Sequence, residues 1–208
     1  MEHIGGLYEQ ETYYVGCIRN NELNNSNYKQ PVGECISKSS LKTILKYLDE
    51  KYSFSSKIFP SGQAFFIRMP YSHKIYNSEC ATPINEENRD PHFFLYHMKE
   101  KGPGEINPEA VLFHELGHAI HARYFGDVSK VPDDIIDNLQ KLCFPRLKQD
   151  EAAKQSELFA DVLSVGLMYQ TPYEKYDVYK EVHPDDKMAF KALVENLLKN
   201  IIPNNPGT

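Results

Sequence analysis

Residues 114–118 read His-Glu-Leu-Gly-His and lie within a segment that has strong signals for an α-helix. Asn107 followed by Pro108 is typical of a helix start, because asparagine caps the first N–H groups and proline suits the first helical position. Gly126 is a stop signal about five helical turns later. The segment therefore predicts a helix that carries the pentapeptide near its centre.

The two histidines of the pentapeptide are four residues apart, so they lie on one helical face and can direct ring nitrogens at one ion. Glu115 lies one step round the helix, where its carboxylate can reach a water on that ion without binding the ion itself. A catalytic zinc site usually has three protein ligands and leaves a fourth position for water. His114 and His118 therefore predict a site for one Zn²⁺ that needs a third ligand from elsewhere in the chain.

The third ligand is expected in residues 150–170, which are predicted to form another helix. Glu157 and Asp161 are four apart and face the same way, in a stretch that is otherwise mostly apolar. Glu157 as a zinc ligand, with Asp161 accepting a hydrogen bond from a ligating histidine, would give both acids a partner. The alternative is that both acids lie on the solvated face of an amphipathic helix.

The pair of motifs, His-Glu-Leu-Gly-His followed by Glu-Leu-Phe-Ala-Asp at 157–161, resembles the gluzincin branch of the zincin metallopeptidases. The resemblance covers about residues 92–170 and is specific at the level of the motifs. In size and motif the chain is similar to small intracellular peptidases related to phage-repressor-cleaving and stress-response proteins. The catalytic domain of lethal-factor-like toxins is a second comparison.

The resemblance implies a role for each polar residue of the two motifs. Zinc would be held by His114, His118 and Glu157. Glu115 would act as the general base, and Asp161 would orient His114. The implied reaction is hydrolysis of a peptide bond by a metal-activated water.

This sequence departs at two points from the patterns of related metallopeptidase families, and these departures limit which branch it resembles. The extended metzincin pattern requires glycine at position 121 and histidine at position 124, where this chain has His121 and Tyr124. Three ligands from one straight helix surround an ion poorly, so we expect His121 to line the groove or to be structural. Lethal-factor-like domains place a tyrosine acid shortly before the downstream glutamate, but this chain has no tyrosine between Tyr124 and Tyr169.

A group that stabilises the tetrahedral oxyanion, besides zinc, is expected to follow the ligand helix. The candidates are His183, Tyr169, Tyr173, Tyr176 and Tyr179. For each of them a packing or surface role is the alternative.

The chain as a whole, residues 1–208, predicts one α+β domain in which a small mixed or antiparallel sheet packs on the active-site helix and further helices. Residues 1–35 are expected to form short strands and loops, or an arm that wraps the domain. Strands are expected at 63–69 and 92–97, and helices at 41–52 (capped by Ser40), 132–144, 150–170 and 185–201. The strand at 92–97 is either a sheet edge that binds an extended peptide or a buried central strand.

Composition bears on partners and location. The net charge of −6 and the pI near 5.8 speak against a nucleic-acid partner. We expect no membrane span, because no apolar run approaches about 18 residues. The N-terminus lacks the features of a signal peptide, so a cytoplasmic location is expected. The four cysteines are scattered and are expected to be reduced structural thiols.

These observations predict a zinc-dependent peptidase that acts on a protein or peptide substrate. One alternative is a zinc-binding regulatory or interaction module whose groove is occluded, for example by residues 1–35. The other alternative is that the pentapeptide is accidental and that the protein is a structural or interaction domain.

Overall fold

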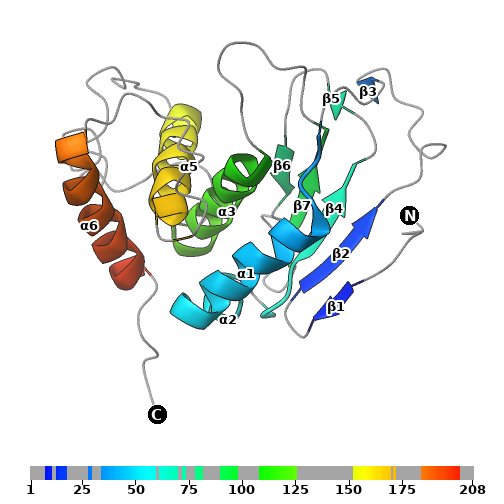
Figure 1. The fold of residues 1–208 in the computed structure, drawn as a ribbon, viewed down its shortest axis with the longest axis horizontal. Helices are drawn as coiled ribbons and strands as arrows, with labels where there is room; N and C mark the ends of the chain where they lie inside the picture. Colours follow the sequence, from blue (N-terminus) through cyan, green and yellow to red (C-terminus); the bar gives the residue numbers. More distant parts are fainter. Residues whose placement is uncertain are drawn as a thin grey trace.

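The computed structural model shows an α+β organisation, with a β-sheet on one side and a succession of helices on the other (Figure 1). It describes residues 8–10, 13–17, 28–29, 34–59, 61–69, 72–73, 78–81, 90–97, 108–125, 152–169, 171 and 184–201.

The main sheet has five strands in the order β1-β2-β4-β7-β6. Its strands are β1 (Tyr8–Gln10), β2 (Tyr13–Cys17), β4 (Phe65–Arg68), β7 (His92–Leu95) and β6 (Ser78–Ala81). The three inner strands run parallel, whereas β1 and β6 are antiparallel to their neighbours. A separate two-stranded sheet joins β3 (Tyr28–Lys29) to β5 (Ser72–His73).

Aromatic side chains fix the middle of the main sheet. Phe66 of β4 and Phe93 of β7 are register partners, and their rings stack with centroids 4.6 Å apart. Both rings are fully buried, and burial alternates along β7 as expected for a strand with one covered face. The strands predicted around 63–69 and 92–97 are therefore confirmed, each shorter than expected.

Of the two alternatives for the strand at 92–97, the sheet edge is wrong and the central strand is confirmed. Strand β7 pairs with β4 on one side and with β6 on the other, so both sides of its backbone are already hydrogen-bonded. Among the described strands, β6 stands at that end of the sheet. The sequence of β6, Ser-Glu-Cys-Ala, lacks the aromatic and β-branched residues that indicate a strand, so the sequence analysis expected no strand here.

The N-terminal segment contributes strands to the main sheet. Residues 8–10 and 13–17 form β1 and β2, and β2 runs parallel to β4. The interpretation of residues 1–35 as short strands and loops is thus confirmed for these strands.

Helix α1 (Lys38–Tyr52) packs its predicted apolar face into the core. Leu41, Ile44 and Leu48 are all fully buried. The helix begins three residues earlier than expected, because Ser37 rather than Ser40 is the cap: the Ser37 hydroxyl accepts a 3.0 Å hydrogen bond from the Ser40 backbone N–H. A short helix, α2 (Phe54–Ile58), follows directly.

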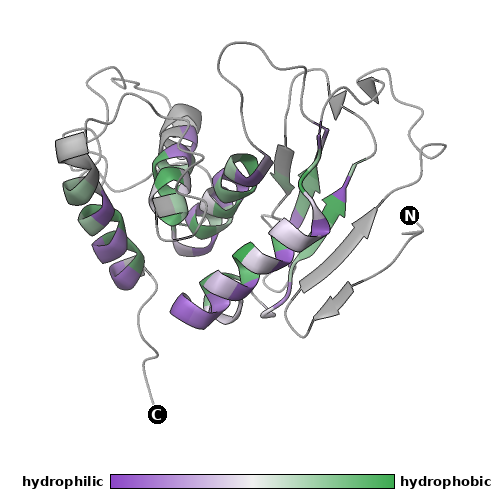
Figure 2. Ribbon diagram, in the orientation of Figure 1, coloured by the Kyte–Doolittle hydropathy of each residue, from purple (hydrophilic) through white to green (hydrophobic). Residues whose placement is uncertain are grey.

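Three long helices form the rest of the described structure. They are α3 (Pro108–Phe125), α5 (Ala152–Tyr169) and α6 (Pro184–Ile201), each starting within two residues of its expected position. Helix α3 lies between the sheet and α5, and α6 packs on α5 (Figure 1). Apolar residues gather where α1, α3 and α5 face one another and the sheet (Figure 2). Asn107, Gly126 and the helix expected at 132–144 lie outside the described residues.

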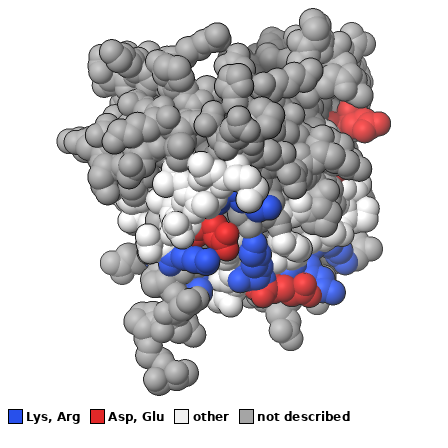
Figure 3. Space-filling model, turned by 60° about the vertical axis from the view of Figure 1, so that its left-hand side comes forward, with Lys and Arg blue, Asp and Glu red and all other residues white. Residues whose placement is uncertain are grey.

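Charged side chains of both signs are interspersed on the described part of the face drawn in Figure 3. Ion pairs on the surface include Lys46–Glu50 at 3.7 Å and Lys199–Glu195 at 3.1 Å. Exposed pairs of this kind contribute little to stability, so the buried helix faces carry most of it. Of the described helices, none combines the length and apolar character that crossing a membrane requires.

Candidate metal centre

Helices α3 and α5 approach each other closely at Gly117, the fourth residue of the pentapeptide. A Cβ atom at this position would lie 2.8 Å from the Cα and 2.9 Å from the carbonyl oxygen of Ala160. Real Cβ atoms do not come this near to backbone atoms, so the crossing needs glycine here. The close crossing brings the side chains of α5 within reach of the two histidines of α3.

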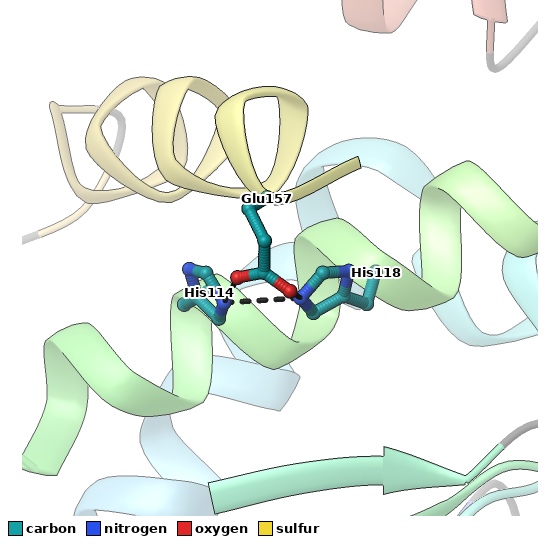
Figure 4. A group of neighbouring side chains, drawn as sticks. All are labelled: His114, His118 and Glu157. Atoms are coloured by element: carbon teal, nitrogen blue, oxygen red, sulfur yellow. Dashed lines mark hydrogen bonds and ion pairs between the residues drawn. The ribbon is translucent and has the colours of Figure 1, made fainter. Parts of the chain in front are cut away.

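Three side chains converge at this crossing. Glu157 projects from α5 toward the rings of His114 and His118 on α3 (Figure 4). One carboxylate oxygen lies 3.3 Å from His114 Nε2 and the other lies 3.4 Å from His118 Nε2. The two Nε2 atoms are 3.0 Å apart. The third side chain that the sequence analysis expected is therefore in place.

The separations of these atoms match those required by one zinc ion. Ligand atoms held tetrahedrally at about 2.0–2.1 Å from Zn²⁺ lie about 3.3 Å from one another. The two nitrogens are 3.0 Å apart, and each lies 3.3 or 3.4 Å from a different oxygen of Glu157, so all of these separations are close to this value. Two imidazoles and one carboxylate are also a ligand set that catalytic zinc sites use. Among the described residues, these three form the group that could hold a metal ion.

Asp161 lies behind the first histidine. The Nδ1–H of His114 donates a 2.8 Å hydrogen bond to an Asp161 carboxylate oxygen, which leaves Nε2 directed at Glu157 and His118. The predicted hydrogen bond between Asp161 and His114 is therefore confirmed. The side chains of Asp161 and Glu157 are 40% and 63% exposed, so both acids face solvent in part while they bind the histidine.

His121 does not join the convergent group. Its side chain is buried, and its ring packs against the rings of Phe125 and Phe159 with centroids 5.7 and 5.5 Å away. Burial lowers the pKa of His121, and the neighbouring His118 lowers it further. The expected structural role, rather than a ligand role, fits this position.

Ser156 is a residue of the site that the sequence analysis missed. Its buried hydroxyl oxygen lies 3.3 Å from His118 Nδ1 and 3.5 Å from His121 Nδ1. The signal available in the sequence was a small polar residue directly before Glu157, at the start of an apolar helical stretch.

The charges of the site are strongly coupled. Burial works against the charged form of His114, but its hydrogen bonds to Asp161 and Glu157, with the nearby charge of Glu115, outweigh burial and raise the pKa of His114 to about 10. Hydrogen bonds from His114 and then His118 hold the pKa of Glu157 well below its usual range. Glu115 itself is buried, at 4% exposure. Its negative charge is one of the causes that raise the pKa of His114, the residue that precedes it.

The candidates for an oxyanion group cannot be placed. His183, Tyr173, Tyr176 and Tyr179 lie outside the described residues. Tyr169 is the last residue of α5, and its side chain also lies outside the described part of the structure.

Comparison of the chain with protein-family models, with curated proteins and with solved structures finds no match.

Proposed function

We propose that the protein is a zinc-dependent metallopeptidase of the gluzincin type. One observation carries the proposal: two imidazole nitrogens and a carboxylate meet at separations that suit Zn²⁺, with Asp161 holding the far side of His114. A zincin-like fold is supported by the arrangement of α3 between the mixed sheet and the helix that supplies Glu157.

Each residue of the site would have its own role in peptide hydrolysis. Zinc bound by His114, His118 and Glu157 would polarise the scissile carbonyl and lower the pKa of a water to about 7. Glu115 would accept a proton from the attacking water and deliver it to the leaving amine. Asp161 would keep the His114 proton on Nδ1, so that Nε2 stays available as a ligand.

The substrate class that suits this arrangement is an extended protein or peptide segment. Because β7 is paired on both sides, we do not propose that this segment docks along residues 92–97.

The experiment that tests this function compares the wild type with Glu115→Gln. Both proteins are loaded with zinc and incubated with a pool of unstructured peptides, whose cleavage is followed by mass spectrometry. We expect the wild type to cleave peptides and Glu115→Gln to lose activity by about 10²- to 10⁴-fold, since a general base contributes this much. Glu115→Gln should retain its zinc.

Chelation supplies the control. Removing zinc from the wild type should abolish cleavage, and restoring one equivalent should recover it. A zinc-loaded wild type that cleaves no more peptide than Glu115→Gln would contradict the peptidase assignment and favour a zinc-binding regulatory module.

A further inference from the structure

The second zinc-binding histidine has a polar contact of its own, formed by Ser156. This serine lies on α5 directly before Glu157 and is buried, at 3% exposure. Its hydroxyl oxygen is 3.3 Å from His118 Nδ1 and 3.5 Å from His121 Nδ1. A hydroxyl has one proton to donate and lone pairs to accept, so it can serve one ring nitrogen as acceptor and the other as donor.

The direction of the two hydrogen bonds follows from the ligand atom of His118. This ring presents Nε2 to Glu157 and His114, so its proton lies on Nδ1 whenever Nε2 acts as a ligand. His118 Nδ1–H therefore donates to Ser156 Oγ. The serine O–H then donates to Nδ1 of His121, whose own proton must lie on Nε2.

The surroundings of His121 suit a ring that accepts the hydrogen bond from Ser156. Its ring is 2% exposed and packs against Phe125 and Phe159, and its Nε2 has no hydrogen-bond partner among the described residues. A buried N–H without a partner is unfavourable, and an apolar side chain at this position would avoid it. What histidine offers here, and an apolar residue does not, is the Nδ1 acceptor that faces Ser156.

We infer that Ser156 and His121 form a positioning chain behind His118, which fixes that ring for metal binding as Asp161 fixes His114. Helix α5 would then supply the third ligand and the groups that orient both histidines. The inference rests on the proposed zinc site. It goes beyond that site in assigning function to two buried residues that bind neither metal nor substrate directly.

The test is a zinc titration against a chelator of known affinity, with Ser156→Ala and a matched control. Losing a group that orients a metal-binding histidine typically weakens metal affinity by about 10- to 100-fold, and we expect this for Ser156→Ala. Ser156→Thr keeps the hydroxyl and should restore most of the affinity. Ser164→Ala is the control, because Ser164 is another buried serine of α5 whose hydroxyl donates to the Ala110 carbonyl oxygen instead of a histidine. Its zinc affinity should match that of the wild type.

A second measurement tests the hydrogen bonds of the positioning chain directly. Nitrogen NMR of ¹⁵N-histidine-labelled protein reports which ring nitrogen carries the proton. We expect His121 to be protonated at Nε2 in the zinc-loaded wild type, and to become a mixture of the two neutral forms in zinc-loaded Ser156→Ala.

The outcomes separate this inference from the proposed function. If wild type, Ser164→Ala and Ser156→Ala all bind zinc equally tightly, the positioning chain is wrong while the zinc site stands. Protonation of His121 at Nδ1 in the zinc-loaded wild type also overturns the positioning chain. Failure of the wild type to bind zinc overturns the proposed function, and this inference with it.

Discussion

His114 is the residue at which the electrostatics of the site concentrate. It lies between two carboxylates, with Asp161 at Nδ1 and Glu157 at Nε2. In the metal-free protein these partners keep the ring protonated at neutral pH, with a pKa near 10. A zinc ligand must be a neutral imidazole. At the proposed zinc site, zinc and a proton would therefore compete for His114 Nε2.

This competition predicts that zinc binding releases protons. Between pH 7 and pH 9 we expect at least one proton to leave His114 per zinc bound, with a further proton from the zinc-bound water as the pH rises above about 7, and zinc affinity to rise with pH until the pKa near 10 is passed. Calorimetric titrations in buffers of different ionisation enthalpy measure the number released. Zinc binding without proton release at pH 7 would contradict the charged state assigned to His114.

Asp161 carries a second prediction at this scale. Asp161→Ala removes the acceptor for His114 Nδ1–H, so the ring is free to rotate and to change its tautomer. We expect zinc affinity to fall by about 10- to 100-fold while the protein stays folded. A zinc-competition titration compares it with the wild type. Superimposable curves would show that the hydrogen bond does not matter for metal binding.

Among the secondary-structure elements, α3 and α5 form the candidate site, because the crossing of these two helices brings its residues together. Gly117 and Ala160 bring the two backbones together at the level of the ligands. Gly166 allows a similar approach further along α5, where an added Cβ would collide with the Val194 side chain of α6. The two glycines therefore offer a matched pair of substitutions.

We expect Gly117→Ala to push α5 away from α3 and so separate Glu157 from the histidines. Alanine favours a helix over glycine by about 1 kcal/mol, but the collision with backbone atoms should outweigh this and lower stability by about 1–3 kcal/mol. Zinc affinity should fall as well. Gly166→Ala should also lower stability, since Val194 must move, but should leave zinc affinity unchanged. Denaturant unfolding and zinc titration of both variants check this, and equal zinc affinity in the two would refute the role of Gly117.

The elements also show what the sequence could and could not predict. The apolar face of α1 and the starts of α3, α5 and α6 followed from spacing and from proline or acidic residues at the helix starts, because these are local properties. The strand β6 and the interior position of β7 did not follow. Strand pairing depends on partners that are distant in the sequence, and the apolar run of β7 suits either a covered edge or a central strand.

The sequence likewise predicted only some of the residues of the candidate site. His114, His118 and Glu157 could be named because four-residue spacing on a helix is visible in the sequence. Ser156 and Gly117 could not, because their roles arise only where α5 crosses α3. The pentapeptide allows any residue at its fourth position, so nothing in the motif marked that glycine.

In the whole molecule, the site lies where two helices meet beside the sheet. Helix α3 contacts the sheet through β6, and α5 and α6 follow on its other side (Figure 1). Strands β1 and β2 extend the same sheet, with β2 paired to β4. Deleting residues 1–35 would therefore remove two strands of the sheet. Such a deletion does not test whether this segment blocks the site.

The most direct test of the zinc site is X-ray absorption spectroscopy at the zinc edge of protein loaded with one equivalent of Zn²⁺. We expect a shell of nitrogen and oxygen atoms at about 2.0–2.1 Å, including two imidazoles, and no sulfur. The chain has four cysteines, so an adventitious thiolate site would add sulfur at about 2.3 Å. Sulfur in the shell, or fewer than two imidazoles, would contradict the assignment of His114, His118 and Glu157 as the zinc ligands.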